Sequence, residues 1–268
     1  MATMPNFGAM RFAFLFLFLG CSLLGISQER VTTFGVELKP IIPSSLFRTG
    51  QSAKTEEGID YEVNQRVGYS MGGVMRFGLT KWLSLESGIS FVRRNFSTNV
   101  FDPNFDFRDT VDYRVIGYEI PVTGLVFVQL SDQIFMNAAF GFALDMFPSD
   151  VGNANRQNDF IALGIRRGFG NQNSLMTWSK LGLLANVGFE FRTKESGYFY
   201  VGGSYHRPFR TIYDNFMYYT DQAGHQYESK LPLSGNYLTL DFSYFFHEDP
   251  EKKEVKRDPD SMPGWMKK

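Results

Sequence analysis

The chain has 268 residues, and its 27 Lys and Arg against 28 Asp and Glu give a formal charge of −1. This length fits one large β domain or two small ones, and a near-neutral charge gives no reason to expect nucleic acid as a partner. A mean hydropathy of −0.20 argues against a membrane protein built from several helices. Aromatic residues form 16% of the chain, and strands that border a lipid interface are one place for so many rings.

The first apolar run, Phe12 to Ile26, predicts a secretory signal peptide. A basic residue precedes the run and small residues end it near Ser27, so residues 1–27 are expected to be absent from the mature protein. Cys21 is the only cysteine, so an internal disulfide is excluded. Two interpretations of Cys21 stay open: it is discarded with the signal, or Leu19-Gly20-Cys21 is a lipoprotein signal that leaves it lipidated.

Beyond residue 28, apolar and polar residues alternate with the two-residue period of β-strands. A tilted strand crosses a bilayer with roughly 9–11 residues, and each alternating segment is long enough to do so. In chain order, the predicted strands are Thr33 to Pro43, Val67 to Leu79, Trp82 to Arg94, Tyr113 to Leu130, Gln133 to Asp145, Trp178 to Arg192, Tyr198 to Phe209 and Asn236 to Phe246.

The last predicted strand shows the pattern most clearly. One face is entirely apolar, whereas the other carries a carboxylate, hydroxyls and two aromatic rings. The mixed face cannot meet lipid and suits an oily core poorly, because buried polar groups need partners. We therefore expect the apolar face to contact lipid and the other to face a lumen. The apolar set is Leu238, Leu240, Phe242, Tyr244 and Phe246; the other set is Tyr237, Thr239, Asp241, Ser243 and Phe245.

The connections between these segments alternate in length. In an up-and-down arrangement every second connection lies at the same rim, so all long loops gather at one end, as in transmembrane barrels. The sequence therefore predicts an all-β protein: an eight-stranded antiparallel up-and-down transmembrane β-barrel over residues 28–246, with a packed polar interior rather than a pore. The long connections are Ser44–Arg66, Phe96–Asp112, Met146–Thr177 and Thr211–Ser234; the short ones are Thr80–Lys81, Ser131–Asp132 and Thr193–Gly197.

Charged residues of both signs occupy the inward-facing positions, and they are expected to pair because an unpaired buried charge is costly. We predict a lumen charge network of Glu37, Arg76, Glu86, Glu119, Lys180, Glu190 and Asp241. In the third long loop, Arg166 and Arg167 either contact lipopolysaccharide phosphates or are solvated. The fourth long loop is aromatic and should pack on the third loop or on a partner, through Tyr213, Phe216, Tyr218 and Tyr219.

No catalytic, cofactor or metal site is predicted. Metal binding is disfavoured because His206, His225 and His247 lack ligand spacing. The nearest enzymatic pattern is Ser204 and His206 with Asp241 on the next strand, as in lipid-modifying barrels. The alternative is that these residues only hydrogen-bond one another in the lumen.

Residues 247–268 form a polar, charge-mixed tail with no periodic apolar face, which predicts a disordered periplasmic extension. Its end carries a small apolar cluster. A second hypothesis is therefore that Trp265 and Met266 bind a periplasmic partner or the base of the barrel.

The signal peptide, the eight alternating segments and the Tyr244-Phe245-Phe246 ending together resemble the small outer-membrane barrels of the OmpX/OmpA type. Gln28 after Ser27, and Tyr118-Glu119-Ile120-Pro121, are similar to the PorT-like barrel proteins of Bacteroidota. The polar tail after Phe246 departs from the usual terminal strand. The resemblance places the chain in the cell outer membrane, and members of these groups serve as adhesins, structural anchors or non-catalytic subunits of secretion and assembly machines.

The first functional hypothesis is a non-enzymatic accessory or structural subunit of an outer-membrane complex. Its expected partners are outer-membrane lipid, lipopolysaccharide and other envelope proteins reached through loops and tail. The alternatives are a stand-alone surface adhesin or structural barrel, and a lipid-modifying enzyme. A soluble lipocalin-like barrel is disfavoured because its interior would be apolar, whereas the inward face here carries charge.

Overall fold

The computed structural model of the chain describes residues 32–44, 52–80, 82–149, 151–154, 161–166, 178–193 and 197–246. The predicted signal peptide, Cys21, Arg167 and the tail with Trp265 and Met266 lie outside these ranges. None of the described residues forms a helix long and apolar enough to cross a membrane.

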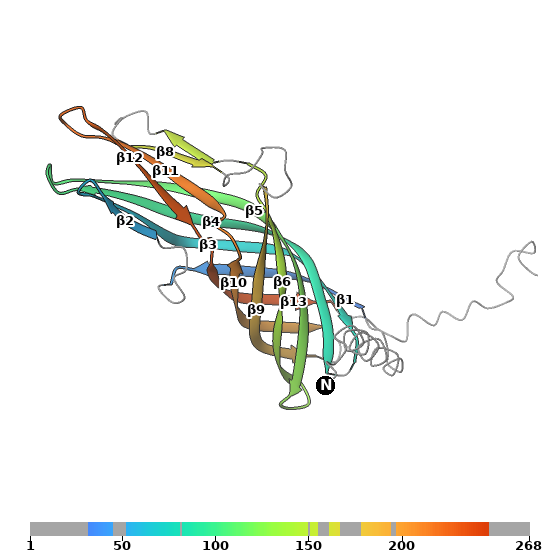
Figure 1. Cartoon of the computed structure of the whole chain (residues 1–268). Helices are drawn as coiled ribbons and strands as arrows, with labels where there is room; N and C mark the ends of the chain where they lie inside the picture. Colours follow the sequence, from blue (N-terminus) through green and yellow to red (C-terminus); the bar gives the residue numbers. More distant parts are fainter. Residues whose placement is uncertain are drawn as a thin grey trace, which may run out of the picture.

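Eight strands form a closed antiparallel barrel, because the nine-stranded sheet β1-β13-β10-β9-β6-β5-β4-β3-β2 is closed by an added pairing of β1 with β3 (Figure 1). Each barrel strand pairs with the strands that precede and follow it in the barrel, so no wall strand has an open edge. The predicted fold is thus confirmed. The barrel strands are β1 (Thr32–Ile42), β3 (Ile59–Gly78), β4 (Leu83–Asp102), β5 (Phe107–Gln129), β6 (Ile134–Met146), β9 (Ser179–Arg192), β10 (Tyr198–Pro208) and β13 (Tyr237–Phe245).

The two faces of the barrel wall have opposite chemistry. Large apolar side chains remain exposed on every wall strand, whereas the alternate positions are buried inside and are largely polar or charged. This is the inverse of a water-soluble domain, and it fits a wall surrounded by hydrocarbon. Examples of the exposed set are Phe34, Val36, Met71, Ile89, Val122, Phe140, Leu181, Phe199 and Leu240.

Short turns close one end of the barrel, as predicted. The Thr80 hydroxyl accepts hydrogen bonds from the backbone N–H groups of Trp82 (3.2 Å) and Leu83 (3.0 Å). The turn at Thr193–Gly197 ends on Gly197 with φ of 86°, a left-handed conformation that favours glycine. Thr32 and Phe246 also lie at this end, since β1 begins opposite Phe77 and the Phe246 N–H bonds the Phe34 carbonyl.

The prediction of four long polar loops is wrong over much of their length. Strands β3, β4 and β5 continue beyond the barrel, where β3 also pairs with β2 (Ser52–Glu56). A second sheet of order β12-β11-β8-β7 lies over this extension (Figure 1). We call this extension and the second sheet the head. The second sheet consists of β7 (Val151–Ala154), β8 (Ile161–Arg166), β11 (Tyr213–Thr220) and β12 (Gln226–Leu233).

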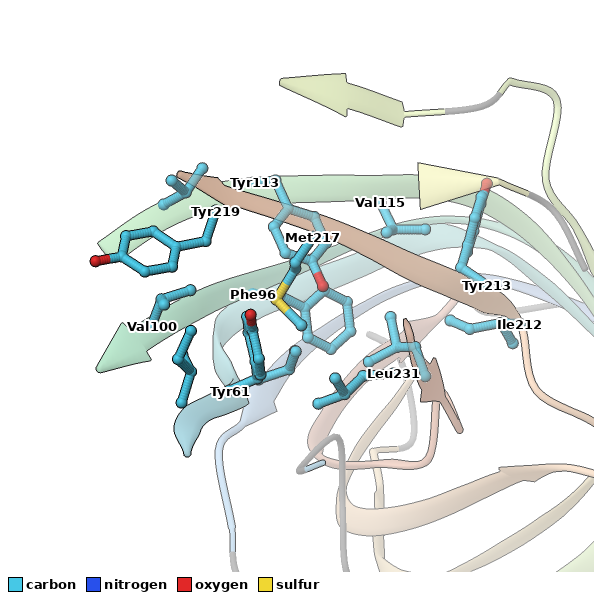
Figure 2. Packing of buried hydrophobic residues seen from close by; sticks show 14 of the residues in the cluster. Tyr61, Phe96, Val100, Tyr113, Val115, Ile212, Tyr213, Met217, Tyr219 and Leu231 are labelled. Carbon is cyan, nitrogen blue, oxygen red and sulfur yellow. The ribbon is translucent and has the colours of Figure 1, made fainter. Parts of the chain in front are cut away.

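The head has a hydrophobic core of its own between its two sheets (Figure 2). Phe96 stacks on Tyr113, with ring centroids 5.5 Å apart, and Phe107 stacks on Tyr219 at the same distance. Residues interpreted as loop are therefore strands that bury an apolar face from water. The main members are Ile59, Tyr61, Val63, Phe96, Val100, Val111, Tyr113, Val115, Tyr213, Met217, Tyr219, Leu231 and Leu233.

One loop prediction is confirmed. The fourth connection was expected to pack on the third, and β11 pairs with β8 over Asp214 to Tyr219. Tyr213 and Tyr219 point into the core, whereas Tyr218 stays exposed.

Candidate functional site inside the barrel

The charged cluster nearest the short turns of the barrel centres on Arg76. The β3–β4 register places it opposite Glu86, and its Nη2 lies 2.9 Å from the Glu86 carboxylate. Barrel closure brings Glu190 from β9 to 2.5 Å from Nη1. The guanidinium also lies 4.0 Å from the ring centroid of Phe245, a distance at which cation–π attraction operates. These charges are mutually compensated, so the cluster stabilises the interior only as a unit.

The middle cluster joins two carboxylates across a small cavity. Glu37 pairs with Lys39 at 2.8 Å and accepts a hydrogen bond from Ser90. Asp241 accepts hydrogen bonds from Ser204, from Thr239 at 2.5 Å and from Asn186 at 2.7 Å. The cavity between them measures about 20 Å³, which is room for about one water molecule. This level of the interior is filled rather than open.

The upper cluster surrounds His206. Its Nδ1 lies 3.1 Å from Glu119 and its Nε2 lies 3.3 Å from Asp145. Arg94 pairs with Asp145 at 2.9 Å, and the Tyr237 hydroxyl donates to Glu119 at 2.5 Å. All five side chains are buried. Arg94, His206 and Tyr237 thus face two carboxylates in one layer at the head end of the barrel.

The structure distributes the predicted network over these levels. Glu37, Arg76, Glu119, Glu190 and Asp241 are buried inside, and Glu86 is partly buried beside Arg76. Lys180 is half-buried near the upper rim, where its backbone pairs with that of Asp145. Six of the seven predicted residues therefore lie within the barrel interior, and Lys180 lies nearer the rim.

The prediction omitted Arg94, Asp145 and His206 from the network. Their strand positions contained the signal: Arg94 has the same parity as Glu86 on β4, and Asp145 lies on the inward face of β6. Sequence periodicity does not show which strands face each other across the interior.

The three residues of the enzymatic pattern do not assemble as a catalytic triad. Ser204 donates its hydrogen bond to Asp241, while His206 lies between Glu119 and Asp145. Among the described residues, no hydrogen bond joins Ser204 to His206. A serine nucleophile needs that bond to lose its proton, so this arrangement matches interior hydrogen bonding.

Glu119, Asp145 and His206 also form a set of possible metal ligands, with one ligand atom from each within 4.8 Å of the others. Spacing along the chain did not reveal it, because the residues lie on three strands. However, the two imidazole nitrogens face different carboxylates, and Arg94 and Tyr237 already bond those carboxylates. A metal prefers ligands at about 2.0–2.2 Å converging on one point. The geometry fits a histidine held between two carboxylates better than a metal site.

A closed wall, exposed apolar residues around it and paired charges within it together define a transmembrane β-barrel. Such barrels belong to outer membranes, so the chain is an outer-membrane β-barrel protein.

Comparisons with solved structures find proteins of the same class. The outer-membrane protein OprG of Pseudomonas aeruginosa is 12% identical with a TM-score of 0.49, over 82% of this chain and 98% of that chain. Outer membrane protein W of E. coli is 11% identical with a TM-score of 0.31, over 82% and 100%. The β-domain of the Bordetella autotransporter BrkA is 11% identical with a TM-score of 0.30, over 81% and 98%. Likenesses this distant say nothing about activity.

No model of a protein family matches the chain, and no curated protein matches it in sequence.

Proposed function

We propose that the protein is a non-enzymatic outer-membrane barrel that serves as an accessory or structural subunit of an envelope complex, presenting its head to a partner protein. The observation that carries the proposal is the combination of a filled interior with a head that has its own apolar core. The described interior is occupied by paired polar and charged side chains, which supports a structural role. A head with its own core provides a preorganised surface, which lowers the entropic cost of binding.

The outer face of the second sheet is the proposed docking surface. Tyr218 is 44% exposed there. It shares β11 with Phe216, over whose ring Lys230 lies at 5.4 Å, and Lys230 also pairs with Asp214 at 3.1 Å. Tyrosine and other aromatic side chains are enriched at protein interfaces, and tyrosine is frequent among their hot spots. Phe105, at the tip of the β4–β5 turn, is a second exposed aromatic side chain of the head.

The finer assignment, a subunit of a secretion or barrel-assembly machine, is supported by the resemblance of Tyr118-Glu119-Ile120-Pro121 to PorT-like barrels. In the same proposal, the apolar wall contacts outer-membrane lipid, Arg166 and Arg167 meet lipopolysaccharide, and Trp265 and Met266 of the tail bind on the periplasmic side.

The test is photo-crosslinking in intact outer membranes. A photoreactive amino acid replaces Tyr218 or Phe105 in the head, Trp265 in the tail, or Val187 on the lipid-facing wall. We expect a discrete protein adduct from a head position and none from Val187, with mass spectrometry identifying the adduct. If the head and tail positions yield no protein adduct, a stand-alone surface adhesin or structural barrel is the better interpretation. Unchanged lipid A and phospholipid profiles in Ser204→Ala would support the non-enzymatic assignment; altered profiles would contradict it.

A further inference from the structure

A basic groove lies on the outer wall where the barrel meets the head. It has a volume of about 530 Å³, and its lining includes Arg66, Arg93 and Arg114. The strand registers fix this arrangement: Asn95 on β4 lies between Arg66 on β3 and Arg114 on β5, and Arg93 is one outward step lower. Three guanidinium groups from three neighbouring strands therefore share one patch.

The positive charge of this groove is poorly compensated. Arg66 contacts Asp112 at 3.4 Å, but the two side chains are 55% and 63% exposed, so the pair is weak. Arg93 bonds the Asn95 amide oxygen at 3.2 Å and lies 6.0 Å from the Tyr69 ring centroid. Within the described part of the chain, neither Arg93 nor Arg114 pairs with a carboxylate. Such a group of arginines matches the geometry and charge of a phosphate.

The height of the groove coincides with the edge of the apolar belt. On β4, the outward positions run from Leu83 through Leu85, Ile89 and Phe91 to Arg93. Ten residues of strand span roughly 33 Å, and a tilt of about 40° reduces this to roughly 25 Å across the membrane. That is about the thickness of the apolar band of outer-membrane barrels. Arg93 therefore lies at the headgroup level, at the end of the barrel opposite the short turns.

An apolar groove lies directly below the arginines. It is also about 530 Å³ in volume. Its lining is Val36, Met71, Ile89, Phe91 and Tyr118, together with Gly72 and the largely buried Glu37. Met71, Phe91 and Tyr118 are paired across β3, β4 and β5. These three residues are the next outward-facing positions after Tyr69, Arg93 and Ile116 in the direction of the short turns. Gly73 deepens this part of the wall, because it lacks a side chain between Val36 and Ile89.

From these two grooves we propose that the outer wall formed by β1, β3, β4 and β5 is a binding site for lipid A, the phosphorylated and acylated anchor of lipopolysaccharide. A phosphate binds Arg66, Arg93 and Arg114, and an acyl chain lies in the apolar groove below. Charge complementarity selects an anionic head, and the adjoining apolar groove selects a lipid over a soluble anion. This site is independent of the proposed docking surface, which lies on the second sheet.

Binding is measured with the full chain purified in a non-ionic detergent, by titration with bisphosphorylated lipid A and with the same lipid after dephosphorylation. Charge-assisted hydrogen bonds are the stronger class. We therefore expect the double variant Arg93→Gln, Arg114→Gln to bind bisphosphorylated lipid A about tenfold more weakly or worse. Arg108→Gln is the control. Arg108 is an exposed arginine on β5, the strand of Arg114, but it lies outside the groove. Retained heat-modifiable electrophoretic mobility shows that each variant is folded.

A second variant tests the acyl groove. A Cβ built on Gly73 meets no atom nearer than the Gly35 carbonyl oxygen at 4.0 Å, so Gly73→Phe fills the groove with little strain on the wall. We expect it to weaken lipid A binding while leaving competition by inorganic phosphate at the arginines unchanged. Equal binding of dephosphorylated lipid A, or wild-type affinity in the double arginine variant, overturns the proposal. Phosphate binding combined with no effect of Gly73→Phe reduces the site to a surface anion site, which also overturns it.

Discussion

The barrel and the head share three strands, β3, β4 and β5, yet the two regions bury opposite kinds of residue. Inside the barrel, β4 places Glu86 and Arg94 against other charges; in the head, two residues further on, it places Phe96 against Tyr113. The change follows the surroundings of the wall. Where hydrocarbon surrounds it, the apolar residues face outwards and the polar ones must pair inside. Where water surrounds it, the apolar residues turn inwards.

The three strands make this change in two different ways. On β4 and β5, the inward parity is kept from barrel to head, and only the residue types change. On β3, the register shifts between Arg66 and Tyr69, so the buried positions are even-numbered in the barrel, as Ser70 and Arg76, and odd-numbered in the head, as Tyr61 and Val63. This irregularity is a β-bulge at the rim, a common place for one.

Moving the apolar residues of β3 to its other face is the sharpest test of this comparison. The variant that exchanges Tyr61 with Glu62 and Val63 with Asn64 keeps the composition but turns two core side chains towards water. Burying a large apolar side chain stabilises by about 1.5–3 kcal/mol, so losing two costs the head roughly 3–6 kcal/mol. We expect rapid protease cleavage in the head with the barrel still heat-modifiable, and an intact, protease-resistant head would contradict the comparison. Deletion of Val67 is the control, because it removes the extra residue between the pairs Arg66–Asn95 and Tyr69–Arg93 and should leave the head core in place.

Arg76→Ala should have the next largest effect, and it acts on the barrel. The substitution leaves Glu86 and Glu190 without their shared cation, and breaking a buried ion pair from one side costs about 3–5 kcal/mol. Denaturant unfolding in detergent micelles measures the loss. The combined variant Arg76→Met, Glu86→Gln, Glu190→Gln should recover much of the stability; failure to recover any would mean that packing rather than charge is responsible.

The same substitution in the two regions should have different costs. Leu231 is 1% exposed in the head core, whereas Leu240 is 48% exposed on the lipid-facing wall. Leu231→Ala creates a cavity and should destabilise the head by about 2–4 kcal/mol, detected by amide hydrogen exchange in β11 and β12. Leu240→Ala, the matched control, should cost much less because its surroundings can adjust. Equal costs would contradict the assignment of Leu240 to a lipid-facing surface.

The smallest expected effect concerns pH at the β11–β12 turn. Burial raises the pKa of Asp221, but hydrogen bonds from the His225 side chain and backbone outweigh it, so the net pKa lies below the ordinary value of 3.8. A lowered pKa in the folded state means that this carboxylate stabilises the turn above pH 3.8, and that the stabilisation is lost as the pH falls through the folded pKa. Hydrogen exchange at the His225 amide across this range measures it; Asp221→Asn should remove the pH dependence.

Sequence reasoning located the barrel because lipid imposes strict alternation on strands of about ten residues. The last strand, with Leu240 and Phe242 opposite Asp241, is such a case. The head was missed because β11, Tyr213 to Thr220, scarcely alternates, so its core positions do not stand out from the residues around them. The β12 segment does alternate, with Tyr227, Leu231 and Leu233 on one side, so its strand pattern was available.

The interior network shows the same limit. The pairing of Arg76 with Glu86 follows from a hairpin and the parity of its strands. The contact of Arg76 with Glu190 instead depends on barrel closure, since β3 and β9 lie on separate parts of the ring. The contacts of His206 with Glu119 and Asp145 likewise depend on how the strands are arranged around the barrel, so the sequence alone did not reveal them.

Strand β4 runs unbroken through 20 residues from Leu83 to Asp102, which corresponds to roughly 66 Å of extended chain. Because its hydrogen-bonded partners β3 and β5 accompany it, a pull applied at the tip is carried as shear along two ladders of backbone bonds. No linker interrupts the strand. Tension on the outermost turn is therefore transmitted directly to the part of the wall that lies in hydrocarbon.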